Sequence, residues 1–327
     1  MFDTKFGCLP TMIGSMPHTD AAEACSLVSR FLKDIPAWPQ LPNRSFLENM
    51  YVQYSQGFPG VVVNGNSIHI DRSQDLSKPL EQLYAAYLAN DFDKYPISPD
   101  YAAGLYRFLG LDNLSPRAVK GQITGPITWG LTVTDDSRRA IIYDDVLGDT
   151  VARLLKLKAG WQEKVLRQLC KNTIIFVDEP YMESYGSSSL ITLTKEKVVG
   201  LLEEVFSGIS GLKGVHCCGN TDWSVLLATS VNILSFDAYN YARSLSLYPA
   251  EIKRFLERGG TIAASLKDRL EESMSPFTRN GVPFKQLIEQ GLLTPSCGLT
   301  PLGSAEGAAR ALELLTDLSS AIRKRYL

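Results

Sequence analysis

The chain has 327 residues, of which 45% are hydrophobic and 21% are charged, and its formal net charge at pH 7 is −2. This composition is typical of a globular protein and excludes intrinsic disorder. The near-neutral net charge gives no electrostatic reason to expect a nucleic-acid partner. No run of the sequence approaches the roughly 18 consecutive apolar residues of a membrane span. Residues 1–5 lack the apolar core of a secretory signal, so we expect a cytoplasmic protein with no membrane partner.

Short apolar runs alternate with longer amphipathic stretches along most of the chain. Such strand–helix alternation predicts a parallel sheet covered by helices. The expected strands are Thr11–Gly14, Ala118–Ile123, Thr173–Val177, Gly214–Cys217, Ile233–Phe236, Thr261–Ser265 and Leu292–Pro295. The clearest helices are Val146–Cys170, Lys195–Phe206, Pro249–Arg258 and Ala305–Lys324.

The interval 36–75 interrupts this alternation. It contains two strand-like pieces, Val61–Asn64 and Ser67–Asp71, and the Asn64-Gly65-Asn66 sequence at their junction is a strong hairpin signal. We therefore predict an insertion that contains a hairpin and caps the mouth of the main domain, not a separate domain.

Reactive or polar side chains follow the predicted strands. In a closed barrel, the carboxyl ends of all strands converge on one face, which carries the active site. An open doubly wound sheet would instead place a Gly-rich loop after its first strand, and no G-x-G-x-x-G or P-loop sequence is present. The pattern thus predicts an α/β fold, a (β/α)8 TIM barrel formed as one domain by residues 1–327. The candidate site residues at the strand ends are Ser15, Gln122, Thr124, Asp178, Glu179, His216, Cys218, Asn220, Asp237 and Cys297.

His216 and Cys218 form a His-x-Cys pair at a strand end, and Cys297 follows another strand about eighty residues later. Side chains two residues apart on a strand point to the same face, and barrel closure would bring Cys297 beside them. Zinc favours thiolate and imidazole ligands, and catalytic zinc sites use three protein ligands and one exchangeable position. The alternative is that His216 is an interior histidine whose hydrogen bonds are made within the protein, and that the cysteines are small core residues. The orientation of Cys217 stays open, because neighbouring strand residues face opposite sides.

Five segments resemble known enzymes of one barrel superfamily. Residues 215–220, V-H-C-C-G-N, are similar to the H-x-C-G-N segment of methylcobalamin:coenzyme M methyltransferases. The other four resemble segments of cobalamin-independent methionine synthase: residues 13–17 (I-G-S-M-P), 120–126 (K-G-Q-I-T-G-P), 177–180 (V-D-E-P) and 295–299 (P-S-C-G-L). The superfamily includes uroporphyrinogen decarboxylase, and its members are (β/α)8 barrels.

The resemblance implies roles for individual residues. His216, Cys218 and Cys297 match zinc ligands in these families. Asp178 matches the carboxylate that binds the substrate amino group, and Ser15 lies in the segment that touches the substrate carboxylate. At the end of another strand, Asp237 is a fourth-ligand candidate, one methylene shorter than the glutamate of methionine synthase.

Two departures from methionine synthase bear on the methyl donor. That family's D-I-H-S segment, which holds a proton-donating histidine, has no match here, because the corresponding residues 263–268 read A-A-S-L-K-D. A counterpart of the N-terminal half that helps to bind folate is also missing. Both departures favour a methyl-corrinoid donor, delivered by a corrinoid partner protein, over a folate.

We therefore expect a zinc-dependent methyltransferase that activates a small thiol, similar to homocysteine or coenzyme M, for methylation by a methyl-corrinoid or methyl-pterin. Two alternatives stay open. One is a metal-free lyase similar to uroporphyrinogen decarboxylase, although no arginine cluster marks the strand ends. The other is a non-catalytic barrel that binds a corrinoid or a thiol.

Overall fold

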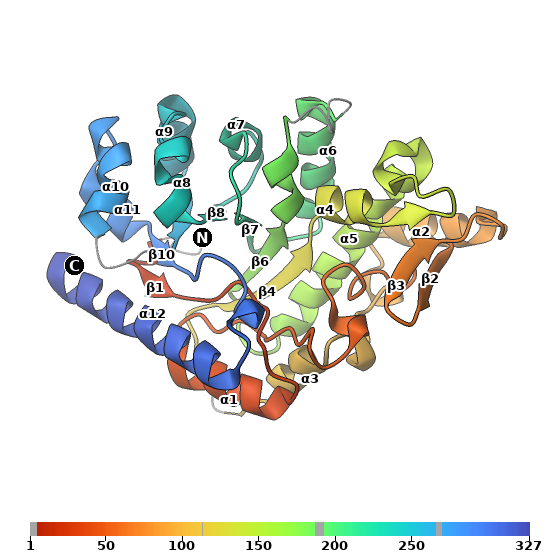
Figure 1. Cartoon of the computed structure of the whole chain (residues 1–327), viewed down its shortest axis with the longest axis horizontal. Coiled ribbons are helices and arrows are strands. Elements are labelled where there is room, and N and C mark those ends of the chain that lie inside the picture. Colours follow the sequence, from red (N-terminus) through yellow and green to blue (C-terminus); the bar gives the residue numbers. More distant parts are fainter. Residues whose placement is uncertain (1–4, 113, 187–192, 266–269) are drawn as a thin grey trace.

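A curled parallel sheet forms the centre of the computed structural model (Figure 1). The structure describes residues 5–112, 114–186, 193–265 and 270–327. Seven strands run in the order β1-β10-β9-β8-β7-β6-β4, and every neighbouring pair is parallel. Their bounds are β1 Leu9–Pro10, β4 Val119–Thr124, β6 Thr173–Asp178, β7 Leu212–Cys217, β8 Ile233–Phe236, β9 Thr261–Ala264 and β10 Leu292–Leu293.

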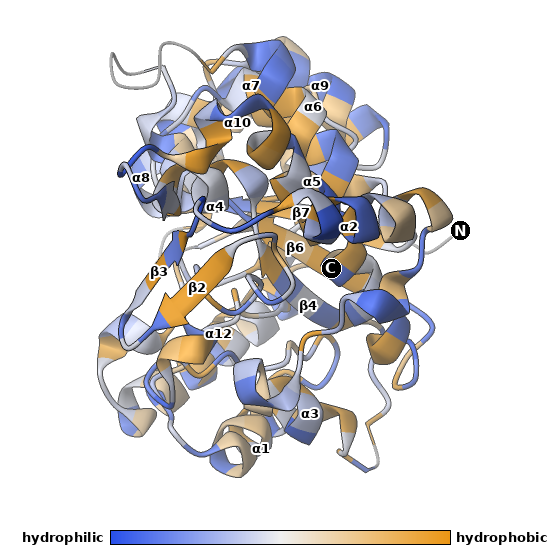
Figure 2. Cartoon of the chain, turned by 90° about the vertical axis from the view of Figure 1, so that its right-hand side faces the viewer, coloured by the Kyte–Doolittle hydropathy of each residue, from blue (hydrophilic) through white to orange (hydrophobic). Residues whose placement is uncertain are grey.

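Helices pack on the convex side of the sheet (Figure 1). Several of them, among them α6 and α9, are apolar along one side and polar along the other, as surface helices of a globular protein are (Figure 2). The bounds are α1 Ala21–Phe31, α2 Ser77–Ala89, α3 Ala103–Leu109, α4 Pro126–Thr132, α5 Asp145–Leu166, α6 Lys195–Phe206, α7 Trp223–Leu227, α8 Ala238–Leu245, α9 Pro249–Glu257, α10 Leu270–Arg279, α11 Phe284–Glu289 and α12 Ala305–Tyr326.

The apolar core has two parts. The larger part fills the space between the sheet and the helices. The smaller part consists mostly of side chains from the strands themselves, such as Leu9, Phe176 and Leu292, and fills the inside of the curled sheet. This division follows from the pleat of the strands, whose successive side chains point to opposite faces. In β6 every residue is buried, as its continuous apolar sequence predicts.

The α/β fold with a curled parallel sheet is confirmed, and the continuous ladder has seven strands, one fewer than the predicted eight, with β1 and β4 at its edges. Residues 36–40 lie between these edges. Two isolated parallel bridges join this segment to its neighbours, one between Ala37 and Lys120 and the other between Ser15 and Gln40. Backbone hydrogen bonds from Trp38 N to Lys120 O (3.3 Å) and from Gln40 N to Gly14 O (3.0 Å) accompany the bridges. The first residues of the predicted insertion thus belong to the sheet.

The predicted first strand, Thr11–Gly14, is also misplaced, since the ladder pairs Leu9 and Pro10 with β10. The other predicted strands agree with the structure to within two residues at either end. The hairpin is confirmed as β2 (Val61–Asn64) and β3 (Ser67–Ile70), which are antiparallel, with Gly65 at φ +57° in the turn. A short strand, β5 (Thr134–Asp135), pairs with β3 in parallel.

The middle of the interval 36–75 packs on the carboxyl end of β4. The hydroxyl of Thr124 donates a hydrogen bond to Met50 O (2.6 Å), and the indole Nε1 of Trp129 donates one to Tyr51 O (2.8 Å). These contacts hold the segment over the end of the sheet where the polar residues gather. No helix within the described ranges is long and apolar enough to cross a membrane.

Candidate metal centre

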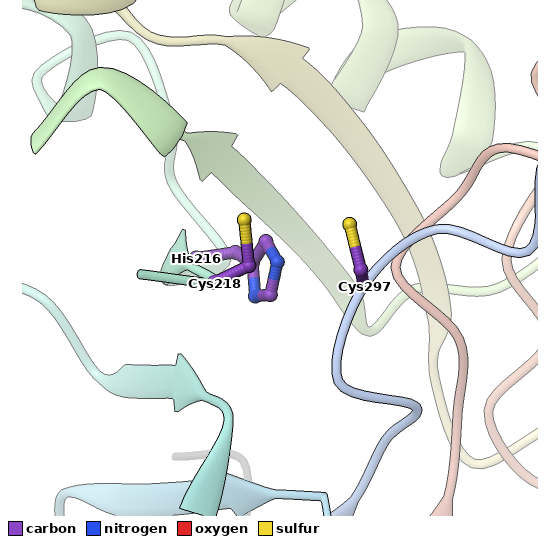
Figure 3. A group of neighbouring side chains, drawn as sticks. All are labelled: His216, Cys218 and Cys297. Atoms are coloured by element: carbon purple, nitrogen blue, oxygen red, sulfur yellow. The ribbon is translucent and has the colours of Figure 1, made fainter. Parts of the chain in front are cut away.

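Three predicted ligands meet at the carboxyl ends of the strands. His216 lies near the end of β7, Cys218 follows that strand directly, and Cys297 lies in the segment after β10. One imidazole nitrogen and the two sulfur atoms all lie within 4.8 Å of one another. Figure 3 shows Cys297 facing His216 and Cys218 from the opposite segment of chain. Curling of the sheet brings these segments together, although β8 and β9 separate β7 from β10.

The environment of His216 fits a metal ligand. Its Nδ1 lies 3.0 Å from the hydroxyl oxygen of Ser235, its register partner on β8. Its Nε2 is buried and has no hydrogen-bond partner among the described residues. A metal-bound histidine ordinarily engages its second nitrogen with a nearby polar group, which orients the ring. An imidazole nitrogen and two thiols are ligands that zinc prefers, and they leave one coordination position for a substrate.

The two thiols influence each other's ionisation. The Cys218 thiol, followed by the His216 imidazole, lowers the pKa of Cys297. The same contact with Cys297, followed by burial, raises the pKa of Cys218. A proton shared between two sulfur atoms thus stabilises only one thiolate. A divalent cation in place of that proton would allow both sulfurs to ionise, as zinc binding requires.

Cys217 faces the other side of the strand. Its side chain is fully buried in the apolar core between the sheet and the helices, and its sulfur donates to Gly219 O at 3.4 Å. Burial is the main cause that raises its pKa to about 12. The question that the sequence left open is therefore answered: Cys217 packs in the wall and does not belong to the cluster.

Asp178 lies beside the cluster, opposite His216 in the register of β6 and β7. Its Oδ1 is buried without a hydrogen-bond partner in the described chain. Burial raises its pKa to about 6, while His216 and then Lys120 act in the opposite direction. A buried carboxyl oxygen without a partner is unusual in a folded protein and is commonly explained by a ligand or by solvent. Asp178 is thus available to an incoming polar group.

Lys120 is a residue of this region that the site prediction missed. Its ammonium is fully buried, donates to Ile13 O at 2.6 Å and lies 4.2 Å from the centroid of the Phe176 ring. Burial lowers its pKa to about 7, and the carboxylate of Asp178 opposes that change. The sequence signal that could have identified Lys120 is a lysine within an otherwise buried strand, because lysine is rarely buried without a partner. Ser235 was also missed, and its signal was one hydroxyl in an otherwise apolar strand.

Ser15 and Asn220 each lie next to a segment that carries a cysteine of the cluster. The carbonyl of Ser15 accepts a hydrogen bond from Leu299 N at 2.7 Å, so Ser15 lies next to the segment that carries Cys297. A Cβ on Gly298 would approach the Ser15 hydroxyl to 1.9 Å, which shows how tightly the two segments pack. Asn220 follows the cysteine pair, is exposed, and accepts a hydrogen bond from the Ser244 hydroxyl at 2.5 Å.

Three of the candidate site residues, which we expected to bind substrate, have side chains that are hydrogen-bonded to the protein itself. The hydroxyl of Thr124 donates its hydrogen bond to Met50 O, as described above. The amide of Gln122 donates to Trp38 O at 3.0 Å and supports the segment between the sheet edges. The carboxylate of Glu179 accepts from Ile127 N (2.9 Å) and Thr128 N (2.7 Å) at the start of α4. The structure therefore gives these side chains positioning roles.

Asp237 is not part of the cluster, which corrects its candidacy as a fourth ligand. Its Oδ1 accepts from the amide of Tyr239 (3.1 Å) at the start of α8 and from the hydroxyl of Ser265 (2.9 Å), and its Oδ2 accepts from the amide group of Asn240 (2.6 Å). It is the N-cap of that helix, a frequent role for aspartate. Among the described residues, the potential metal ligands are the imidazole and the two thiols alone.

Comparisons with known proteins agree with this architecture. No family model matches the chain, and no curated protein does. A B12-independent methionine synthase from Shewanella sp. W3-18-1, solved with selenomethionine, aligns at 14% identity and TM-score 0.57 over 97% of this chain and 98% of that one. A methyltransferase from Methanosarcina mazei aligns at 11% identity and TM-score 0.56 over 97% and 99%. The chain shares the fold of these enzymes, as its sequence motifs predict.

Proposed function

We propose that the chain is a zinc-dependent methyltransferase that methylates a small thiol. The observation that carries the proposal is the convergence of His216, Cys218 and Cys297, with the buried Nε2 of the histidine lacking a partner in the described chain. Zinc held there would lower the pKa of an incoming thiol and keep it as a thiolate nucleophile. The methyl group would move from the donor to this sulfur, and the thiol proton would leave as the sulfur binds.

The side chains around the cluster would position the reactants. Ser235 orients the imidazole through Nδ1. The unpartnered oxygen of Asp178 offers an acceptor to the ammonium group of a thiol that resembles homocysteine. Glu179 and Thr124 hold α4 and residue 50 in place. Positioning of this kind supplies a large part of catalysis in group transfer.

The donor we propose is a methyl-corrinoid, brought by a corrinoid protein, and a methyl-pterin is the second candidate. The support lies at the end of β9, where Ala263 and Ala264 are followed by Ser265 and methionine synthase carries a histidine. We further propose that residues 36–40 complete an eight-stranded barrel within a single domain. The parallel bridges of this segment to both neighbours support that arrangement.

Metal content tests the proposal. We expect elemental analysis of protein purified without chelator to give about one zinc per chain, and Cys297→Ser to lose it. Cys170→Ser is the matched control, because that cysteine contacts Pro116 O and is not among the clustered residues. The zinc-loaded protein should then transfer the methyl group of methylcobalamin to homocysteine or coenzyme M.

Each other result would favour a different function. No zinc after anaerobic reconstitution would refute the proposal and favour a metal-free lyase. Zinc and corrinoid binding without methyl transfer to any thiol would favour a non-catalytic binding protein.

A further inference from the structure

A cavity of about 660 Å³ adjoins the candidate metal centre on the side of Cys297. It is bounded by the segment after β10, the short helix η7 (Thr300–Leu302), α12 and the start of α8. Its volume lies within the range of roughly 300–1,000 Å³ that is common for sites of small organic ligands. Because Cys297 contributes to both the cluster and the cavity lining, a molecule bound to the metal could extend into this space.

Part of the cavity lining is polar. Thr294 lines it, is 1% exposed, and its hydroxyl has no hydrogen-bond partner among the described residues. Asp237 and Ser265 also belong to the lining. The Thr294 hydroxyl is inaccessible to solvent, and the hydroxyl of Ser265 donates to Asp237 at 2.9 Å, so recognition in this cavity is expected from its apolar side chains.

The outer wall is apolar. From α12 it includes Ala311, Leu314, Leu315 and Leu318, whose spacing places them on one face of the helix. Leu302 closes the wall from η7. Leu314 is 63% exposed and Leu302 is 48% exposed, although both are large apolar side chains. Contiguous exposed apolar surface of this kind commonly marks a binding site.

We propose that this groove binds an apolar alkyl or aryl substituent of the acceptor thiol. The inference rests on the proposed function: the sulfur would occupy the open metal position, and the substituent would lie along the leucine wall. A short, charged thiol such as homocysteine or coenzyme M would leave most of that wall uncovered. Among small thiols, the preferred acceptor is therefore one that carries an apolar substituent, and homocysteine and coenzyme M would be weaker substrates.

Calorimetric titration of the zinc-loaded protein with ethanethiol, butanethiol and hexanethiol tests the proposal. Affinity should rise roughly fourfold for each added methylene that becomes buried. Leu314→Asp should weaken hexanethiol binding by about tenfold or more and leave ethanethiol binding unchanged. Leu88→Asp is the matched control, because Leu88 is 76% exposed on α2 and does not line the groove. Leu302→Asp provides a second variant of the wall.

A parallel titration of chelator-treated protein with hexyl methyl sulfide separates this inference from the proposed function. Binding that Leu314→Asp and Leu302→Asp both weaken would support the groove, even if the protein proved unable to transfer methyl groups. Equal affinity for the three thiols in a zinc-loaded, active enzyme, unaffected by either substitution, would overturn the groove and leave the methyltransferase proposal in place.

Discussion

Polar side chains at the strand ends divide into those already bonded to the protein and those that are not. Glu179 and Asp237 each hold the amino end of a helix. By contrast, Nε2 of His216 and Oδ1 of Asp178 are buried without partners in the described chain. Buried polar groups are normally satisfied, so the second set marks where a metal or substrate is expected.

The hydrogen bond between Ser235 and His216 should tune metal affinity. With Nε2 as the metal ligand, Nδ1 carries the proton and donates it to the hydroxyl oxygen of Ser235. Ser235→Ala should weaken zinc binding by roughly 10–100-fold, as measured by competition with a chromogenic chelator. Ser29→Ala, which loses a hydroxyl bonded to Cys25 O within α1, should bind zinc like the parent protein. Equal affinities for all three proteins would contradict the role of Ser235.

Glu179 should make stability depend on pH. Burial raises its pKa to about 7 from an ordinary value of 4.5, so between these pH values the folded state holds a proton that the unfolded state has released. The free energy of unfolding should therefore fall as the pH rises from about 4.5 to about 7, by up to about 1.4 kcal/mol per pH unit. Buried Asp178, whose pKa is raised to about 6, adds a slope of the same sign at lower pH, so the contribution of Glu179 is clearest between about pH 6 and pH 7. Urea unfolding should show that Glu179→Gln reduces the slope in that interval and that the exposed Glu257→Gln leaves it unchanged. A slope between pH 6 and pH 7 that Glu179→Gln does not change would refute the assignment.

The strand period of two and the convergence of strand ends predicted that His216, Cys218 and Cys297 could meet, and the resemblance to known enzymes singled them out as ligands; the structure brings the three side chains together. Sequence spacing was insufficient for Glu179 and Asp237. Whether a carboxylate at a strand end faces a ligand or caps a helix depends on where the next helix begins. That position is decided by tertiary packing, which a local pattern does not record.

At the scale of elements, residues 36–40 show why one edge of the sheet escaped prediction. The segment contains Pro36 and Pro39, and a proline lacks the amide hydrogen that a strand ladder needs. Only isolated bridges form as a result. The hairpin β2–β3 was predictable, because its Asn-Gly turn is a local signal. The pairing of residues 36–40 depends on contacts with Ser15 and Lys120, which are distant in sequence.

The contact between α3 and this segment should be sensitive to added volume. A Cβ on Gly104 would lie 1.8 Å from the carbonyl oxygen of Pro39, a backbone atom that no side-chain rotation can move. Gly104→Ala should therefore lower the free energy of unfolding by about 1–3 kcal/mol. Gly200→Ala within α6 has nothing within 4 Å of the added atom and should raise it by about 0.5–1 kcal/mol. If urea unfolding gave Gly104→Ala the same free energy of unfolding as the parent protein, residues 36–40 would be able to move away from α3.

At the scale of the whole molecule, the cluster connects parts of the chain about eighty residues apart. His216 and Cys218 come from the end of β7, whereas Cys297 follows β10, near the sheet edge formed by β1. Two strands, β9 and β8, lie between β10 and β7 in the sheet, so the cluster bridges segments that only the curl of the sheet brings together. The metal centre and the fold should consequently stabilise each other.

Metal binding should thus be visible in global stability. A ligand that binds only the folded state stabilises it by RT ln(1 + [L]/Kd), or about 4 kcal/mol at a thousand times Kd. Zinc should therefore raise the midpoint of thermal unfolding of the chelator-treated protein by several degrees. Cys297→Ser should show no increase, because only ligands from β7 remain, whereas Cys170→Ser should respond like the parent protein. An unchanged midpoint in the parent protein at saturating zinc would mean that the three side chains do not hold a metal that links β7 to the segment after β10.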